Sequence, residues 1–190
     1  MNTNDSRARD GQPEESHMAV DTTTDPGMED SFGKRLAGKY MTFKLANEEY
    51  GLEILKVREL IGQMEITRVA KTKEFIRGVI NLRGKVIPVV DLGLKFGMGP
   101  VADTDQTVII VVQYQSGDEE VTMGILVDEV LEVLSMQAEN IDAPPNFNNS
   151  TTSTDFIVGI GKAEKRVIFL LDIGRALDSK RIGPPQAIAN

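Results

Sequence analysis

The fold is decided by residues 75–92, which read FIRGVINLRGKVIPVVDL. Two apolar runs, 75–82 and 86–90, are separated by Arg83-Gly84-Lys85. Short runs rich in β-branched residues, with glycine between them, are typical of a β-hairpin. Pro88 has no N–H to donate to a neighbouring strand, so we expect an edge, a bulge or an unpaired position there.

A similar pattern returns later in the chain. Residues 156–160 (FIVGI) resemble residues 75–79 at an offset of 81, and Asp172-Ile173-Gly174 matches Asp91-Leu92-Gly93 at the same offset. Upstream, Gly51-Leu52 aligns with Gly124-Ile125 at an offset of 73. The change in offset indicates about eight extra residues in the second unit, within the polar segment 140–155. Internal similarity on this scale predicts two similar lobes.

The remaining segments also favour strands. Residues 40–45 alternate apolar and polar side chains, 50–54 begin a second strand, and 108–112 are five consecutive β-branched residues. Residues 55–61 fit either a bent strand or a short helical turn. We therefore predict a mainly β fold of two five-stranded β-barrel lobes, internally duplicated, with short helices.

We place one domain at residues 38–178. Its first lobe covers about 40–100 and its second about 105–178, with exchange of strands between the lobes allowed. Residues 1–36 carry eight acidic and four basic side chains and few large apolar ones, so we predict a disordered acidic tail over 1–37. A short docking peptide is the alternative there. Residues 179–190 form a C-terminal tail.

Composition limits the chemistry. The chain has no cysteine and one histidine, His17, so neither a disulfide framework nor a cysteine or multi-histidine metal site is expected. The formal charge of −8 argues against nucleic-acid binding. No apolar run approaches the length of about 20 residues that a membrane span needs, and no export signal is recognisable. We expect a cytoplasmic protein without a cofactor or metal, monomeric when free.

Few residues suggest catalysis. Asp91 and Asp172 each precede a short amphipathic segment, so both are predicted to cap helices. The enzymatic alternative is a hydrolase whose pocket contains both aspartates, or one of them beside a lysine such as Lys162. Arg83, at the hairpin tip, and Glu59 are either solvated or partner contacts.

The motifs resemble those of the CheW family. Residues 48–59 (EEYGLEILKVRE) resemble its opening signature, residues 75–92 its central signature, and residues 124–128 (GILVD) its second-lobe strand. The resemblance covers roughly residues 38–178. It implies two five-stranded barrels around a shared core, and a non-enzymatic adaptor of chemotaxis that helps to assemble signalling arrays. The implied partners are the regulatory domain of the histidine kinase CheA and the cytoplasmic tips of methyl-accepting chemoreceptors.

The resemblance also implies positions for two binding surfaces, with a receptor helix lying in an apolar groove between the lobes. The receptor-contacting set is Val57, Glu59, Gly78, Asn81, Arg83 and Gly84. The kinase-contacting set is Ile54, Leu60 and Gln63. Related chains fuse this domain to a receiver or a kinase; this sequence favours a stand-alone adaptor. Two alternatives stay open: the same adaptor role in a motility or gene-regulatory pathway, and a small-molecule binding module that uses the groove.

Overall fold

The computed structural model describes residues 26–62, 64–144 and 155–178, without the side chains of residues 26–30. The elements in chain order are α1 (Pro26–Leu36), β1 (Gly38–Leu45), β2 (Glu48–Glu53), the 3-10 turn η1 (Ile54–Lys56), β3 (Val57–Ile61), β4 (Ile76–Leu82), β5 (Lys85–Asp91), α2 (Leu92–Lys95), β6 (Val108–Ser116), β7 (Glu119–Val127), β8 (Glu129–Met136), η2 (Ala138–Asn140), β9 (Ile141–Asp142), β10 (Ile157–Ala163), β11 (Arg166–Leu171) and α3 (Ile173–Leu177). None of the helices in these ranges is long and apolar enough to cross a membrane.

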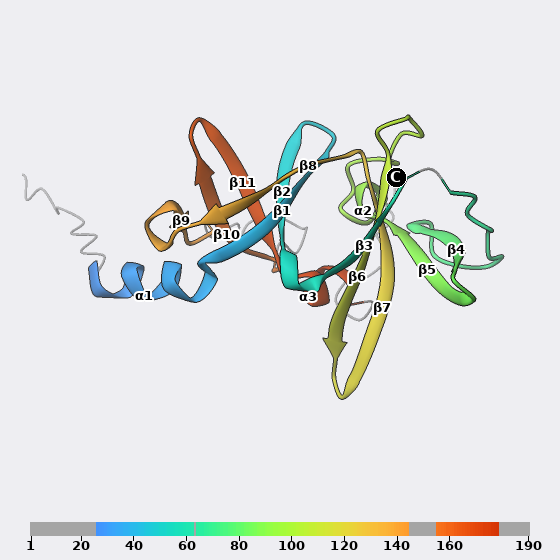
Figure 1. Cartoon of the computed structure of the whole chain (residues 1–190), viewed down its shortest axis with the longest axis horizontal. Coiled ribbons are helices and arrows are strands. Elements are labelled where there is room, and N and C mark those ends of the chain that lie inside the picture. The colour runs from blue at the N-terminus through green and yellow to red at the C-terminus, as the bar shows by residue number, and fades with distance from the viewer. Residues whose placement is uncertain (1–25, 63, 145–154, 179–190) are drawn as a thin grey trace, which may run out of the picture.

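The strands form two sheets, which lie side by side in Figure 1. Sheet A has six strands in the order β8-β1-β2-β11-β10-β9, and sheet B has five in the order β3-β6-β7-β5-β4. Most neighbours are antiparallel, and each sheet has one parallel pair, β2–β11 in sheet A and β5–β7 in sheet B. The predicted mainly β class with short helices is confirmed. The sixth strand of sheet A is β9, which contributes two residues.

The two sheets repeat one arrangement, as the internal similarity predicted. The first five strands of sheet A match the five strands of sheet B in order: β8 with β3, β1 with β6, β2 with β7, β11 with β5, and β10 with β4. The corresponding hairpins β4–β5 and β10–β11 even share a bulge, between Ile76 and Gly78 in one and between Ile157 and Gly159 in the other.

Sheet membership departs from chain order, through an exchange of strands that the lobe boundaries near residues 100 and 105 allowed. Strands β1 and β2 belong to sheet A with the C-terminal strands, whereas β6 and β7 belong to sheet B with β3, β4 and β5. The chain passes from sheet A to sheet B after β2 and returns after β7. The physical reason is edge pairing: β11 and β5 each gain a parallel neighbour from a distant hairpin, so fewer strand edges stay open.

The larger hydrophobic core contains residues of both sheets, with Leu92 of α2 and Ile173 of α3 among its buried members. An aromatic pair that packs against this core joins the lobes. The ring of Phe96, just after α2, stacks on that of Phe156, just before β10, with centroids 4.3 Å apart and an interplanar angle of 7°. Tyr50 of β2 lies 5.9 Å from Phe96 and 5.6 Å from Phe169 of β11, measured between ring centroids. The core predicted to be shared by both lobes is therefore partly aromatic.

The N-terminal segment differs from the expected tail in its last part. Disorder was predicted through residue 37, yet residues 26–36 form α1. Phe32 and Leu36, one helical turn apart, pack on a smaller core of sheet A that includes Tyr40, whose hydroxyl donates to the Leu36 carbonyl oxygen at 2.6 Å. That small apolar face was too short to stand out in a polar sequence. Residues 1–25 and 179–190, also predicted as tails, lie outside the described residues.

Both predicted helix caps are confirmed. The Asp91 carboxylate accepts from the Leu94 amide at 2.9 Å and the Asp172 carboxylate from the Arg175 amide at 3.0 Å. Asp91 is fully buried and also accepts from the Val101 amide at 3.1 Å. Lys162, the lysine of the hydrolase alternative, pairs with Asp142 at 2.7 Å. Pro88 is the register partner of Val79 on β4, but on its other side it precedes the ladder between β5 and β7, which begins at Val89.

The two caps provide a matched pair for a stability test. Asp172→Ala should lower the free energy of unfolding by about 1 kcal/mol, the usual cost of losing a cap. Asp91→Ala should cost about 2 kcal/mol more, because it leaves buried amides without an acceptor. Urea unfolding monitored by circular dichroism measures both, with Asp118→Ala in the exposed β6–β7 turn as the control. Equal losses at the two caps would contradict the role assigned to burial.

Candidate functional site

The candidate site is built on sheet B. Val57 and Glu59 lie on β3, Gly78 and Asn81 on β4, and Arg83 and Gly84 in the β4–β5 turn. Strands β3 and β4 are the two edges of this sheet. The sheet curls far enough to bring side chains from both edges into contact, so residues far apart in strand order share one surface.

An ion pair closes the gap between these edges. The Arg83 guanidinium nitrogen lies 2.8 Å from a carboxylate oxygen of Glu59. The Arg83 side chain is 80% exposed and that of Glu59 is 29% exposed. A pair this open contributes little to stability, yet it aims a guanidinium with several free donors at solvent beside a carboxylate. Such paired charges suit recognition of a partner better than support of the fold.

The turn that carries Arg83 is held by its neighbours. Arg83 and Gly84 both have positive φ, 51° and 82°, which matches the two-residue turn that suits the twist of a hairpin. The Asn81 side-chain oxygen accepts from the Gly84 amide at 2.9 Å. Asn81 and Gly84 therefore fix where Arg83 points.

Gly78 has a different role. It is buried, has a φ of 147°, and a Cβ there would collide with the carbonyl oxygen of Thr67. Thr67 pairs with Val79 through two backbone bonds of 2.9 Å each. Gly78 thus lets the segment that crosses from β3 to β4 lie against β4, and it shapes the surface from below.

The predicted kinase-contacting residues are only partly brought together. Ile54 in η1 is half-buried against the core, Leu60 on β3 is 45% exposed, and Gln63 lies outside the described residues. Two strongly exposed apolar side chains were missed by sequence reasoning, Leu55 in η1 at 81% and Val86 on β5 at 71%. Val86 had a signal in its sequence, because it alternates with buried Ile87. Leu55 had none, since the sequence left its segment ambiguous.

A buried lysine lies behind sheet B. Lys95 of α2 is buried, with its ammonium nitrogen 4.1 Å from the centroid of the Phe75 ring. Burial lowers the pKa of Lys95 to about 8, with repulsion from Lys73 acting in the same direction and Asp178 opposing it. Burial also raises the pKa of Tyr40 to about 12, helped by Glu53. It raises the pKa of Tyr50 as well, where the hydroxyl donates to Glu48 at 2.6 Å.

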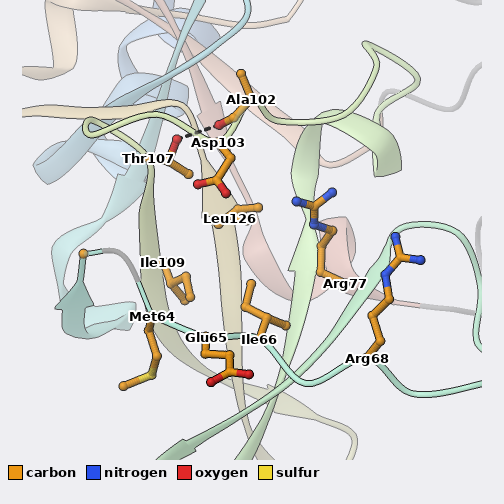
Figure 2. Close-up of a pocket in the computed structure, with 11 residues that line it drawn as sticks. Met64, Glu65, Ile66, Arg68, Arg77, Ala102, Asp103, Thr107, Ile109 and Leu126 are labelled. Atoms are coloured by element: carbon orange, nitrogen blue, oxygen red, sulfur yellow. Dashed lines mark hydrogen bonds between the residues drawn. The ribbon is translucent and has the colours of Figure 1, made fainter.

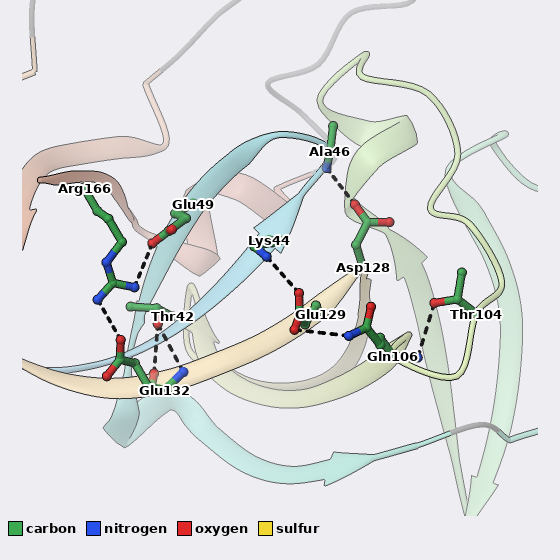
Figure 3. A network of polar contacts seen from close by, with 10 residues as sticks. All are labelled: Thr42, Lys44, Ala46, Glu49, Thr104, Gln106, Asp128, Glu129, Glu132 and Arg166. Carbon is green, nitrogen blue, oxygen red and sulfur yellow. Dashed lines mark hydrogen bonds and ion pairs between the residues drawn. The ribbon is translucent and has the colours of Figure 1, made fainter.

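Polar contacts hold the return from sheet B to sheet A (Figure 3). The Asp128 carboxylate, between β7 and β8, accepts from the Ala46 amide at 2.6 Å, and Lys44 pairs with Glu129 at 3.0 Å. Along the same edge, Arg166 of β11 reaches Glu132 of β8 at 2.7 Å and Glu49 of β2 at 3.4 Å. These contacts are structural: the Asp128 and Glu129 contacts fix the start of β8 beside β1, and the Arg166 contacts tie β11 to β8 and β2.

Comparison with known proteins gives a consistent result. Residues 39–181 match the family model of the CheW-like domain. The chain is 39% identical over 150 residues to the chemotaxis protein CheW of Klebsiella aerogenes, covering 79% of this chain and 87% of that protein. It is 34% identical over 133 residues to the probable chemotaxis protein CheW of Rhizobium etli, covering 70% and 83%. The crystal structure of the scaffolding protein TtCheW from Thermoanaerobacter tengcongensis superposes with a TM-score of 0.66 at 36% identity, covering 75% and 93%.

Substitution of exposed Arg83 and of buried Gly78 should have different effects on the free energy of unfolding. Arg83→Ala should change the free energy of unfolding by less than about 1 kcal/mol, because its ion pair is exposed. Gly78→Ala should cost about 2 kcal/mol or more, because it strains the backbone and displaces Thr67. Gly38→Ala is the matched control, since a Cβ at Gly38 meets no atom within 4 Å. Chemical denaturation measures all three, and a large loss in Arg83→Ala would show that the ion pair supports the fold.

Lys95 predicts a pH dependence. Its folded pKa of about 8 lies below the ordinary 10.5, so between these values the unfolded chain binds the proton more than the folded chain does. Stability should therefore rise with pH across this window. We expect the stability advantage of Lys95→Met over the wild type to shrink from pH 7 to pH 9.5, measured by urea unfolding. Stopping there avoids the tyrosines of raised pKa, and a constant difference would contradict the burial of a charged Lys95.

Proposed function

The chain belongs to the CheW-like domain family, and on that premise we propose that it is a chemotaxis adaptor that couples methyl-accepting chemoreceptors to the histidine kinase CheA. In this proposal it works at the cytoplasmic tips of the receptors, binds no catalytic cofactor, and acts by holding two partners together. The observation that carries the proposal is the exposed Arg83–Glu59 pair within a CheW-like fold.

We assign the receptor contact to the surface around that pair. A receptor helix that presents polar and apolar side chains would meet Arg83 and Glu59 for register, and exposed Val86 for apolar contact. Charges of this kind reject mismatched partners more than they add affinity. Asn81, Gly84 and Gly78 act as positioning residues, because they hold the turn and the segment behind it. Val57, half-buried at the start of β3, supports the same edge.

The kinase contact is assigned to the neighbouring apolar side chains of η1 and β3. Leu55 and Leu60 are exposed, and Ile54 fixes η1 to the core behind them. Gln63 belongs to this set by its place in the sequence. A regulatory domain that covers Leu55 and Leu60 would remove apolar surface from water, the usual source of affinity at an interface centre. The two partners then bind on adjacent parts of one sheet.

A non-enzymatic role fits the assignments of the acidic side chains. Asp91 and Asp172, the residues on which the hydrolase alternative rested, are acceptors for helix amides in separate lobes. Their carboxylates already have these backbone partners, and Asp91 is buried away from solvent. What the described surface offers is a set of contacts for other proteins.

A capture experiment tests the adaptor and its receptor surface together. The CheA regulatory domain and a receptor-tip fragment from the same organism are immobilised separately, and wild type and Arg83→Glu are compared on each. Wild type should bind both. Arg83→Glu should bind the receptor fragment roughly tenfold or more weakly, because a central charge is reversed, while its binding to the kinase domain is unchanged.

The chain offers a matched control. Glu164 occupies the same place in the β10–β11 turn as Arg83 does in its own, with φ of 54° against 51°. Glu164→Lys should leave both partners bound. The double variant Glu59→Arg/Arg83→Glu restores the ion pair with its charges exchanged. It distinguishes the loss of the ion pair from the loss of a positive charge at position 83. Normal receptor binding by Arg83→Glu would remove the assigned surface, and failure of folded wild type to bind either partner would overturn the adaptor role.

A further inference from the structure

The two lobes differ at one end of their sheets. In sheet A this end is covered by α1, whose Phe32 and Leu36 pack on the smaller core. Leu36 lies close to β10, because one of its terminal carbons would be 2.8 Å from a Cβ at Gly159. A helix with two large apolar side chains one turn apart thus covers this end of sheet A.

The repeat identifies the corresponding place in sheet B. Thr67 pairs with Val79 just as Asp142 pairs with Ile160, so Ile66 corresponds to Ile141. By the same pairings Ile109 corresponds to Tyr40, and by the sequence offset Arg77 corresponds to Val158. In sheet A these three counterparts all belong to the smaller core on which α1 packs.

In sheet B the same place is a cavity of about 310 Å³. Its lining includes Ile66, Ile109 and Leu126, which occupy the middle of the view in Figure 2. The volume lies at the lower end of the range typical for ligand sites, about 300–1,000 Å³. The cavity therefore has room for a large apolar side chain, as Leu36 is accommodated in sheet A.

The rim of the cavity is charged where sheet A is apolar. Arg68 and Arg77 lie on one side, Asp103 lies across from them, and the Glu65 carboxylate points away (Figure 2). Arg77 is 30% exposed and 3.8 Å from Asp91, whose oxygens already accept backbone amides, so most of its donors stay available. The charged lining residues are two arginines and two carboxylates, and they are segregated rather than mixed. The side of the cavity that carries Arg68 and Arg77 therefore favours an acidic group.

We propose that this cavity docks an acidic amphipathic helix of a partner protein, which inserts a large apolar side chain against Ile66 and Ile109 and sets a carboxylate against Arg68 and Arg77. The occupant is the counterpart of α1, supplied by another molecule and carrying the charge that the arginines require. The guanidinium groups match a carboxylate through paired donors. Asp103 disfavours a carboxylate on its own side and so orients the helix.

This site goes beyond the proposed function, and its two arginines are separate from the Arg83–Glu59 pair. Arg77 lies near the start of β4, and Arg83 follows its end. Six residues of extended strand separate them by about 20 Å. Loss of one site should leave the other intact, so the capture experiment with Arg83→Glu and the experiment below fail independently.

The probe is a 14-residue acetylated helical peptide with Phe and Leu four positions apart and glutamates flanking them. Two matched peptides replace Phe and Leu by Ala, or every Glu by Gln. The full chain, labelled with ¹³C at its Ile and Leu methyl groups, is titrated with each and followed by NMR. We expect saturable shifts at Ile66, Ile109 and Leu126 but not at Ile141, and severalfold weaker binding of both matched peptides.

Variants of the chain sharpen the result. A Cβ at Gly62, which lines the cavity, meets no atom within 4 Å, so Gly62→Trp should block the cavity without disturbing the fold. Gly38→Trp, equally unobstructed but in sheet A, is its control. Arg68→Gln should weaken binding of the acidic peptide severalfold, and Asp103→Asn should strengthen it.

Four outcomes would overturn the proposal. The first is no saturable shift with the acidic peptide, and the second is equal binding of the glutamine peptide. A third is saturation of the same methyl groups by 4-phenylbutyrate as tightly as by the peptide, which would indicate a small-molecule site. The fourth is tighter peptide binding by a chain lacking residues 2–25, which would make the chain's own acidic segment the occupant.

Discussion

The structure depends on the aromatic contact between its lobes. The rings of Phe96 and Phe156 stack with their centroids 4.3 Å apart. Phe96 directly follows α2, which Asp91 caps, and Phe156 directly precedes the hairpin β10–β11. Because Tyr50 and Phe169 surround the same point, residues from both sheets and from the segment after α2 meet there. The orientation of one sheet against the other therefore follows from ring packing, which favours a few offset or tilted geometries. Any surface made by both lobes inherits its shape from this contact.

Sequence reasoning was accurate where local patterns decide the structure. The hairpin at residues 76–91, the two aspartate caps and the repeat all depend on short-range periodicity or on side chains that bond their own neighbours. The placement of β1–β2 in sheet A depends on pairing across more than a hundred residues, such as Gly51 with Leu170, and that of β6–β7 in sheet B on pairing with β5, such as Gly124 with Val89. The alternation of apolar and polar side chains along a strand does not indicate which distant strand it pairs with. For the same reason α1 was missed, because only the core of sheet A makes a helix of its short apolar face.

The candidate site shows the same division. Arg83 and Glu59 were predicted as contact residues through the motif, and the structure adds the reason that these two side chains meet: the edges of sheet B curl toward each other. The crossing segment anchored at Thr67 and Gly78 is the second part of that closure. Leu55 could not be identified from sequence, because its exposure follows from a single 3-10 turn between two sheets. Surfaces made by irregular connections need coordinates, whereas surfaces on hairpin tips can be read from turn chemistry.

The exchange of strands has a kinetic consequence. Sheet A pairs β2, residues 48–53, with β11, residues 166–171, so its central ladder awaits a strand that is synthesised more than a hundred residues after β2. During synthesis the hairpin β1–β2 waits with an apolar face and an unpaired edge, a state that invites chaperones or aggregation. Pairings this distant along the chain also slow spontaneous folding, because loop closure precedes the stabilising contacts. The same topology makes sheet A hard to open at β1–β2, since releasing this hairpin would separate β8 from β11.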